Sequence, residues 1–179
     1  MSLRYAMLGF IDMMPLTGYD LKKLFNSSVK YYWTATHSQI YRTLDEMKKS
    51  RLIREEYIPQ ADLPDKKLYH ITEKGKLALH QWAAQPADIP PVRHALLVQL
   101  SWADRLNTDE IAGLLREYAE KLKDRLALYA DESQHRFIAM ARTPREQYLW
   151  EAVLQNGIHA YRAELQWTEE TIRGLEAFE

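Results

Sequence analysis

Residues 36–52 carry the clearest pattern of apolar and polar positions in the chain. Apolar side chains recur there at i, i+4 and i+7, which predicts a helix with one buried stripe formed by Ile40, Leu44 and Met47. Thr36 and Gln39 form a capping box, in which each side chain accepts a hydrogen bond from the other residue's backbone amide. This pair predicts that the helix begins directly after Thr36.

Two further helices are predicted before this one. Apolar residues at helical spacing predict the first over residues 3–13, and Pro15 cannot continue it. The second helix is expected to begin after Thr17, because Asp20 completes another capping box three residues later.

Two short strands and a further helix follow residues 36–52. Residues 52–58 and 67–71 are rich in β-branched and aromatic side chains, and a polar, proline-bearing loop joins them. Thr72 then caps a helix that is expected to end near Trp82. This order of elements predicts a winged helix-turn-helix, in which the hairpin is the wing.

Three prolines within residues 86–91 mark the boundary between two parts of the chain, since they favour an extended connection over a helix. We therefore expect a winged-helix domain over residues 1–85, a linker over 86–91 and a helical domain over 92–179. The whole fold is predicted to be mainly α with a small β-hairpin wing.

The second part predicts three helices. They cover residues 91–102, residues from Thr108 into the 130s, and a helix of roughly 30 residues that opens with Thr143, Pro144 and Glu146 as a capping box. The last helix carries a seam with gaps of four and three residues: Leu154, Ile158, Tyr161, Leu165, Thr168, Ile172 and Leu175.

This seam predicts a homodimer, because it offers more apolar surface than one helix of the same chain easily covers. The expected dimer contacts are Leu154, Ile158, Tyr161, Leu165 and Ile172. The alternative is a hairpin between the last two helices within one chain.

Composition narrows the class of protein. Hydrophobic residues make up 46% and charged residues 27%, as in ordinary soluble domains, and no apolar run is long enough to span a membrane. The chain has no cysteine, which excludes disulfides and thiolate catalysis and suits the cytoplasm. We find no metal-ligand spacing, catalytic constellation or glycine-rich phosphate loop, so the sequence predicts neither a cofactor nor an enzyme.

Charge is distributed unevenly between the two parts. Residues 1–86 hold thirteen Lys/Arg and nine Asp/Glu, a balance of +4, whereas residues 87–179 hold eleven and sixteen, a balance of −5. The basic residues of the first part lie on elements that share one face of a winged helix: Lys22, Lys23, Arg42, Lys48, Lys49, Arg51, Lys66 and Lys67. They indicate a surface for DNA phosphates; the alternative is an ordinary solvated surface.

Ser38, Gln39, Tyr41 and Arg42 are side-chain types that bind phosphates and base edges, and they surround the first turns of the helix that begins after Thr36. Two of them have structural alternatives. Gln39 can serve the helix cap alone, and Tyr41 can be half-buried against the preceding helix.

Four segments of the chain resemble the PadR family of transcriptional regulators, in the branch with a longer helical C-terminal domain. They are YAMLGFIDMMPLTGYDLKKLF, YYWTATHSQIYRTLDEMKKSRLI, KKLYHITEKGKLALHQW and AYRAELQWTEETIRGL. The resemblance implies a C-terminal domain that dimerises through its long helices and a palindromic operator in double-stranded DNA, usually with repression. It also implies, for some relatives, release from DNA by phenolic acids or other small aromatic effectors.

By the same resemblance, the residues that face DNA are Tyr19, Ser38, Gln39, Tyr41, Arg42, Lys66 and Lys67, to which Lys22 and Lys23 add positive charge on the second helix. The chain departs from the family where a glycine often precedes the first strand, since it has Ser50 and Arg51 there. It also has Lys67 where the family commonly has arginine. The alternative to a DNA-binding regulator is a winged-helix adaptor that binds proteins without reading DNA.

Overall fold

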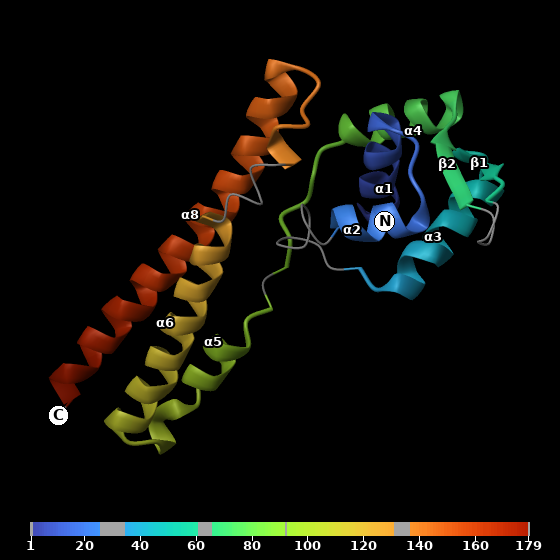
Figure 1. Cartoon of the computed structure of the whole chain (residues 1–179). Helices are drawn as coiled ribbons and strands as arrows, with labels where there is room; N and C mark the ends of the chain where they lie inside the picture. The colour runs from blue at the N-terminus through green and yellow to red at the C-terminus, as the bar shows by residue number, and fades with distance from the viewer. Residues whose placement is uncertain (1, 26–34, 61–65, 92, 131–136, 179) are drawn as a thin grey trace. The chain divides into compact units, whose positions relative to one another are not determined.

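The computed structural model describes residues 2–25, 35–60, 66–91, 93–130 and 137–178. The chain divides into two compact units, Met1–Asp88 and Ile89–Glu179, and each is described by itself (Figure 1). The first unit contains helices and a two-stranded antiparallel sheet, and the second is helical. The predicted fold class, mainly α with a β-hairpin wing, is thereby confirmed. Within the described residues, none of the helices has the length and hydrophobicity to cross a membrane.

The first unit follows the order that the sequence predicted. Its elements are α1 (Ser2–Met13), α2 (Gly18–Leu24), α3 (His37–Lys49), β1 (Ile53–Ile58), β2 (Lys66–Ile71) and α4 (Glu73–Ala83). Both capping boxes are present, so Thr17 and Thr36 are the N-caps of α2 and α3. In the hairpin Ile53 pairs with Ile71, and Leu16 forms a further bridge to Tyr69 on β2. The loop tip, residues 61–65, lies outside the described residues.

The core of the first unit is built from one apolar face of each helix. The predicted stripe of α3 is buried, and it meets buried side chains of α1, α2 and the hairpin, among them Met7, Leu8, Ile11, Leu21, Ile53 and Tyr69. Since burial of such side chains is the main stabilising term in a small domain, this core fixes how α2, α3 and the wing lie relative to one another.

The turn after α3 holds an arginine in a conformation that favours glycine. Arg51 has φ of 59°, the left-handed region. The Arg51 amide donates to Lys48 O and the Leu52 amide to Met47 O, both at 2.9 Å, which is the Schellman pattern for ending a helix. Glycine adopts this conformation without steric cost, whereas this chain forms the turn with an arginine at higher conformational cost.

Helix α4 begins directly against this turn. The Thr72 hydroxyl has the carbonyl oxygens of Arg51 at 2.8 Å and of Leu52 at 3.0 Å as acceptors for its single hydrogen, and it accepts from the Gly75 amide at 3.0 Å. A Cβ built on Gly75 would lie 2.2 Å from the Leu52 carbonyl oxygen, so only glycine allows this approach.

The second unit consists of α5 (Ala95–Leu100), the 3-10 turn η2 (Ala103–Arg105), α6 (Thr108–Ala130), α8 (Pro144–Leu175) and the turn η3 (Glu176–Phe178). The prediction of a helix over residues 91–102 was wrong at its start. Helix α5 begins only after His94, whose Nδ1 accepts from the Leu97 amide at 3.4 Å. Only one of the two hydrogen bonds of the capping box predicted for the last helix is formed, since Thr143 Oγ1 accepts from the Glu146 amide. The Glu146 carboxylate accepts from the amide of Arg142 in place of the amide of Thr143.

Helices α6 and α8 lie side by side along most of their length (Figure 1). Tyr129 on α6 packs against Tyr161 and against Gly157, where a Cβ would lie 2.5 Å from the Tyr129 hydroxyl. Thr168, a residue of the predicted seam, is fully buried. The hairpin that the sequence left open as an alternative is therefore formed within one chain, and it covers part of the seam.

Candidate nucleic-acid interface

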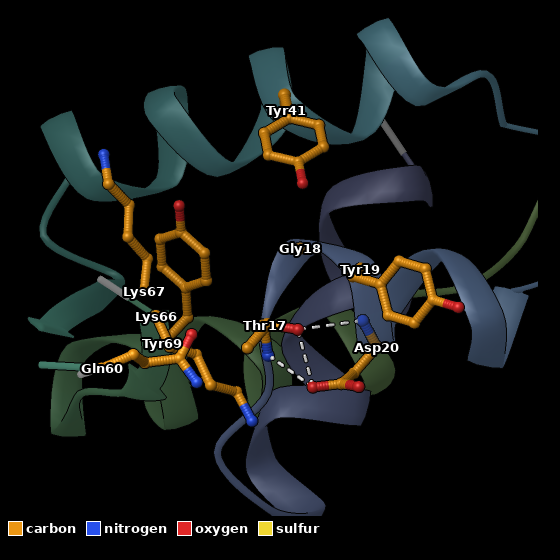
Figure 2. A pocket seen from close by; sticks show the side chains of 9 residues that line it. All are labelled: Thr17, Gly18, Tyr19, Asp20, Tyr41, Gln60, Lys66, Lys67 and Tyr69. Carbon is orange, nitrogen blue, oxygen red and sulfur yellow. Dashed lines mark hydrogen bonds between the residues drawn. The ribbon is translucent and has the colours of Figure 1, made fainter. Parts of the chain in front are cut away.

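A hollow of about 410 Å³ lies where α2, α3 and the wing meet (Figure 2). Its walls come from the start of α2, from one residue of α3 and from the hairpin: Thr17, Gly18, Tyr19, Asp20, Tyr41, Gln60, Lys66, Lys67 and Tyr69. Four of the residues predicted to face DNA, namely Tyr19, Tyr41, Lys66 and Lys67, are thus brought together. The backbone bridge between Leu16 and Tyr69, with hydrogen bonds of 2.9 and 3.2 Å, ties the start of α2 to the wing and holds the hollow's two sides in place.

The start of α2 is fixed by the pair of Thr17 and Asp20. Asp20 Oδ2 accepts from the Thr17 hydroxyl at 2.7 Å and from the Thr17 amide at 3.2 Å. The hydroxyl's hydrogen bond lowers the pKa of Asp20 from its ordinary value; burial opposes the shift, and the backbone bond and the positive charges of Lys66 and Lys23 add to it. The carboxylate is thereby committed to the helix cap.

Helix α3 presents its outer face fully exposed. Ser38 and Arg42 stand four residues apart, and Asp45 and Lys49 extend the same stripe by three and four residues, all with exposed side chains. Gln39 is also exposed, but its Oε1 accepts from the Thr36 amide at 2.8 Å, so the structural role foreseen for it is real. The cap and the buried stripe together hold this outer face at a fixed angle to the wing.

Tyr41 leaves this stripe and points toward α2 (Figure 2). The ring lies over Gly18, where an added Cβ would be 2.8 Å from the ring and from its hydroxyl. On its other side the ring contacts His37, with centroids 4.5 Å apart. The side chain remains 39% exposed, so it packs against α2 and still reaches solvent.

The basic residues of α2, α3 and the wing differ in their exposure and in the groups that they contact. Lys22 and Lys23 are exposed on α2, and Lys66 and Lys67 are exposed on β2. The Lys67 ammonium lies over the ring of Tyr57 at 5.3 Å.

Lys48 is engaged elsewhere, because its ammonium lies 2.8 Å from the Glu55 carboxylate on β1. This hydrogen bond raises the pKa of Lys48 and lowers that of Glu55. The sequence analysis placed Lys48 among the basic residues expected to bind phosphates. In the structure its ion pair with Glu55 instead connects α3 to the wing.

Sequence reasoning missed two of the hollow's residues that matter for its shape. Gly18 carries no side chain that could signal binding, and Gln60 lies in the loop after β1, outside the helices on which the search for binding residues centred. The importance of a closely packed glycine can be recognised only when the residue that packs against it from another helix is known. Among the described residues, no group of three or more His, Asp and Glu side chains is placed to hold a metal ion.

Two family descriptions match the chain. "Transcriptional regulator PadR-like family" covers residues 7–81 and "Virulence activator alpha C-term" covers residues 92–176. A probable transcriptional regulator of Mycobacterium tuberculosis is 32% identical to the chain over 98% of both proteins. The negative transcriptional regulator PadR of Bacillus subtilis is 29% identical over 70% of this chain and 69% of its own length.

Solved structures have the same fold. Bacillus subtilis PadR in complex with operator DNA superposes with a TM-score of 0.85 at 24% identity, covering 98% of this chain and 99% of that one. The same protein in complex with p-coumaric acid gives 0.80 at 24% identity, covering 97% and 98%. The Vibrio cholerae virulence activator AphA gives 0.74 at 27% identity, covering 99% of both chains.

Proposed function

We infer that this chain, which belongs to the PadR-like family of transcriptional regulators, is a cytoplasmic DNA-binding repressor that acts as a homodimer on a palindromic operator. The family is one of transcriptional regulators and not of enzymes. The observation that carries the proposal is the outer face of α3, capped at Thr36 and flanked by the lysine-bearing hollow.

The arrangement supports two kinds of DNA contact, one to base edges and one to backbone phosphates. The exposed stripe with Ser38 and Arg42 is suited to base edges in the major groove, which admits a helix. The exposed lysines of α2 and of the wing belong to the two elements that neighbour this helix and are suited to the phosphates of the flanking strands. The structure of B. subtilis PadR with operator DNA supports the same role for this fold.

Arg42→Ala is expected to weaken binding to the DNA upstream of the protein's own gene by about tenfold or more, since one good bidentate contact contributes roughly 1–3 kcal/mol. Fluorescence anisotropy across a series of salt concentrations measures this effect. The matched control is Arg116→Ala, which removes the same charge from an exposed position on α6 and is expected to bind normally.

Equal affinity of Arg42→Ala and wild type would show that the recognition face of α3 is wrongly assigned. A wild-type protein that shows no salt-sensitive, sequence-preferring binding would contradict the proposed function as a whole. The remaining candidate would then be the winged-helix adaptor that binds proteins.

We place the homodimer contact on the second unit, where large apolar side chains stay exposed. The predicted seam residues Leu154, Ile158, Tyr161, Leu165 and Ile172 are each partly covered. More surface is open around α5 and the first turns of α8, at Leu97, Val98, Trp102, Tyr148, Leu149 and Val153. Apolar clusters of this kind mark interaction surfaces, and a two-fold dimer matches the two half-sites of a palindrome.

We further propose that the protein represses transcription and that a small aromatic acid relieves this repression. Its support is that B. subtilis PadR is named a negative regulator and has been solved with p-coumaric acid. A reporter gene behind the protein's own upstream DNA is expected to fall when the protein is expressed and to recover when p-coumaric acid is added. A reporter that rises with expression would make the protein an activator, and one that stays repressed would exclude this acid as effector.

A further inference from the structure

The contact between Tyr41 and Gly18 joins the reading helix to the helix before it. A Cβ on Gly18 would lie 2.8 Å from both Cζ and the hydroxyl oxygen of Tyr41, closer than real Cβ contacts occur. Gly18 is buried, and α2 has no unusual backbone angle there that would itself demand glycine. An alanine at this position would therefore force the Tyr41 ring to move from where it lies.

The Tyr41 ring forms one wall of the hollow between α2, α3 and the wing. Figure 2 shows its hydroxyl pointing from α3 toward α2, while the ring of Tyr69 stands on the wing with its hydroxyl toward α3. The exposed lysines Lys66 and Lys67 line the same hollow. Tyrosine hydroxyls and lysine side chains are groups that bind a phosphate, and both kinds line this open hollow.

We propose that this hollow holds one backbone phosphate of the bound DNA, to which the Tyr41 hydroxyl donates, and that Gly18 is the positioning residue that keeps Tyr41 there. The proposal rests on the proposed DNA-binding function and assigns a specific contact within it. Tyr41 accordingly serves affinity and orientation, whereas Ser38 and Arg42 on the outer stripe serve sequence preference.

Among the described residues that line the hollow, only Asp20 has a carboxylate, and its position limits its repulsion of a phosphate there. Asp20 Oδ2 is held by the amide and hydroxyl of Thr17. Figure 2 shows the Asp20 side chain turned away from Tyr41 and toward the Lys66 ammonium. The hydrogen bond from the Thr17 hydroxyl is the main cause of the lowered pKa of Asp20, and the positive charge of Lys66 adds to it.

Tyr41→Phe tests the hydroxyl while keeping the ring over Gly18. We expect affinity to fall about tenfold, the size of a hydrogen bond to a charged group, and by the same factor on the upstream duplex and on an unrelated duplex of equal length. A loss confined to the upstream duplex would make Tyr41 a base-reading residue and overturn the phosphate assignment. Neutral methylphosphonates scanned along the duplex should reveal a position that weakens the wild type and leaves Tyr41→Phe unaffected; the absence of such a position would also overturn it.

A double-mutant cycle tests the positioning role of Gly18. Gly18→Ala alone is expected to lower affinity about tenfold, and the same change in a Tyr41→Ala background is expected to have no effect, because no ring remains to be displaced. Equal losses in both backgrounds would show that Gly18 acts on the helix and not through Tyr41. Gly9→Ala, at a position where a Cβ meets nothing within 4 Å, controls for helix propensity.

Thermal unfolding of each variant shows whether it remains folded. If Gly18→Ala alone fails to fold, folding of the Gly18→Ala, Tyr41→Ala double variant would show that the alanine acts through the Tyr41 ring, and its failure to fold would overturn the positioning role. Wild-type binding without salt sensitivity would contradict the proposed function, whereas salt-sensitive wild-type binding with additive variants would contradict only the role of Gly18.

Discussion

Gly75→Ala is expected to destabilise the first unit by about 3 kcal/mol, at the upper end of what overpacking costs. The new methyl group would lie 2.2 Å from the Leu52 carbonyl oxygen and 2.8 Å from Ile71 Cγ1. A backbone carbonyl cannot rotate away as a side chain does, so α4 must shift. The shift would stretch the bonds from Thr72 to Arg51 and Leu52, which fasten α4 to the end of α3. Alanine's better helix propensity, about 1 kcal/mol, offsets only part of this cost.

Urea unfolding followed by far-UV circular dichroism measures the effect as a lower midpoint. Gly9→Ala is the matched control, because the same exchange in α1 meets no neighbour within 4 Å. It is expected to leave stability unchanged or to raise it by up to about 1 kcal/mol. A Gly75→Ala variant as stable as the wild type would mean that α4 does not lie against the Leu52 carbonyl.

Replacing Val98 and Trp102 together by lysine is expected to convert the proposed dimer into monomers. Both side chains are largely exposed within one chain, at 63% and 74%, so the change should leave the fold of the monomer intact. In a dimer the same positions would place two added charges per chain in an apolar contact, which is costly without partners. Sedimentation velocity measures the change in mass, and circular dichroism shows that the helices remain.

Loss of the dimer should also lower operator affinity by about a hundredfold or more, because two linked half-site contacts become independent. Ile89→Lys is the matched control, since Ile89 is an exposed apolar residue at the start of the second unit. If the doubly substituted protein remains dimeric, the dimer contact does not involve Val98 and Trp102, and the seam residues of α8, beginning with Leu154 and Ile158, would be tested next.

The parts of the interface that follow from local rules were predictable. The capping pairs at Thr17 and Thr36 each involve residues three apart, and they place the starts of α2 and α3 where the structure has them. The buried stripe of α3 follows from spacing alone. The last long helix was likewise located by Thr143 and Pro144.

The parts that depend on a distant partner were not predictable. Lys48 looked like a phosphate-binding lysine, and its partner Glu55 lies on β1. Helix α5 was expected to begin at Pro91, but it begins only after the cap at His94, whose Nε2 contacts Glu164 on α8 at 2.9 Å. The seam of α8 suggested a second chain, and α6 covers part of it within one chain.

The sequence by itself determined the winged helix-turn-helix, the residues on the outer face of α3 and the two-part organisation. These depend on periodicity, caps and turn residues, which act over three to seven positions. Only the tertiary structure showed how closely other residues approach Gly18 and Gly75, that Lys48 pairs with Glu55 and which face of α8 stays exposed. Each of these depends on atoms that folding brings within a few ångströms of one another. Such contacts cannot be predicted from the spacing of residues along the chain.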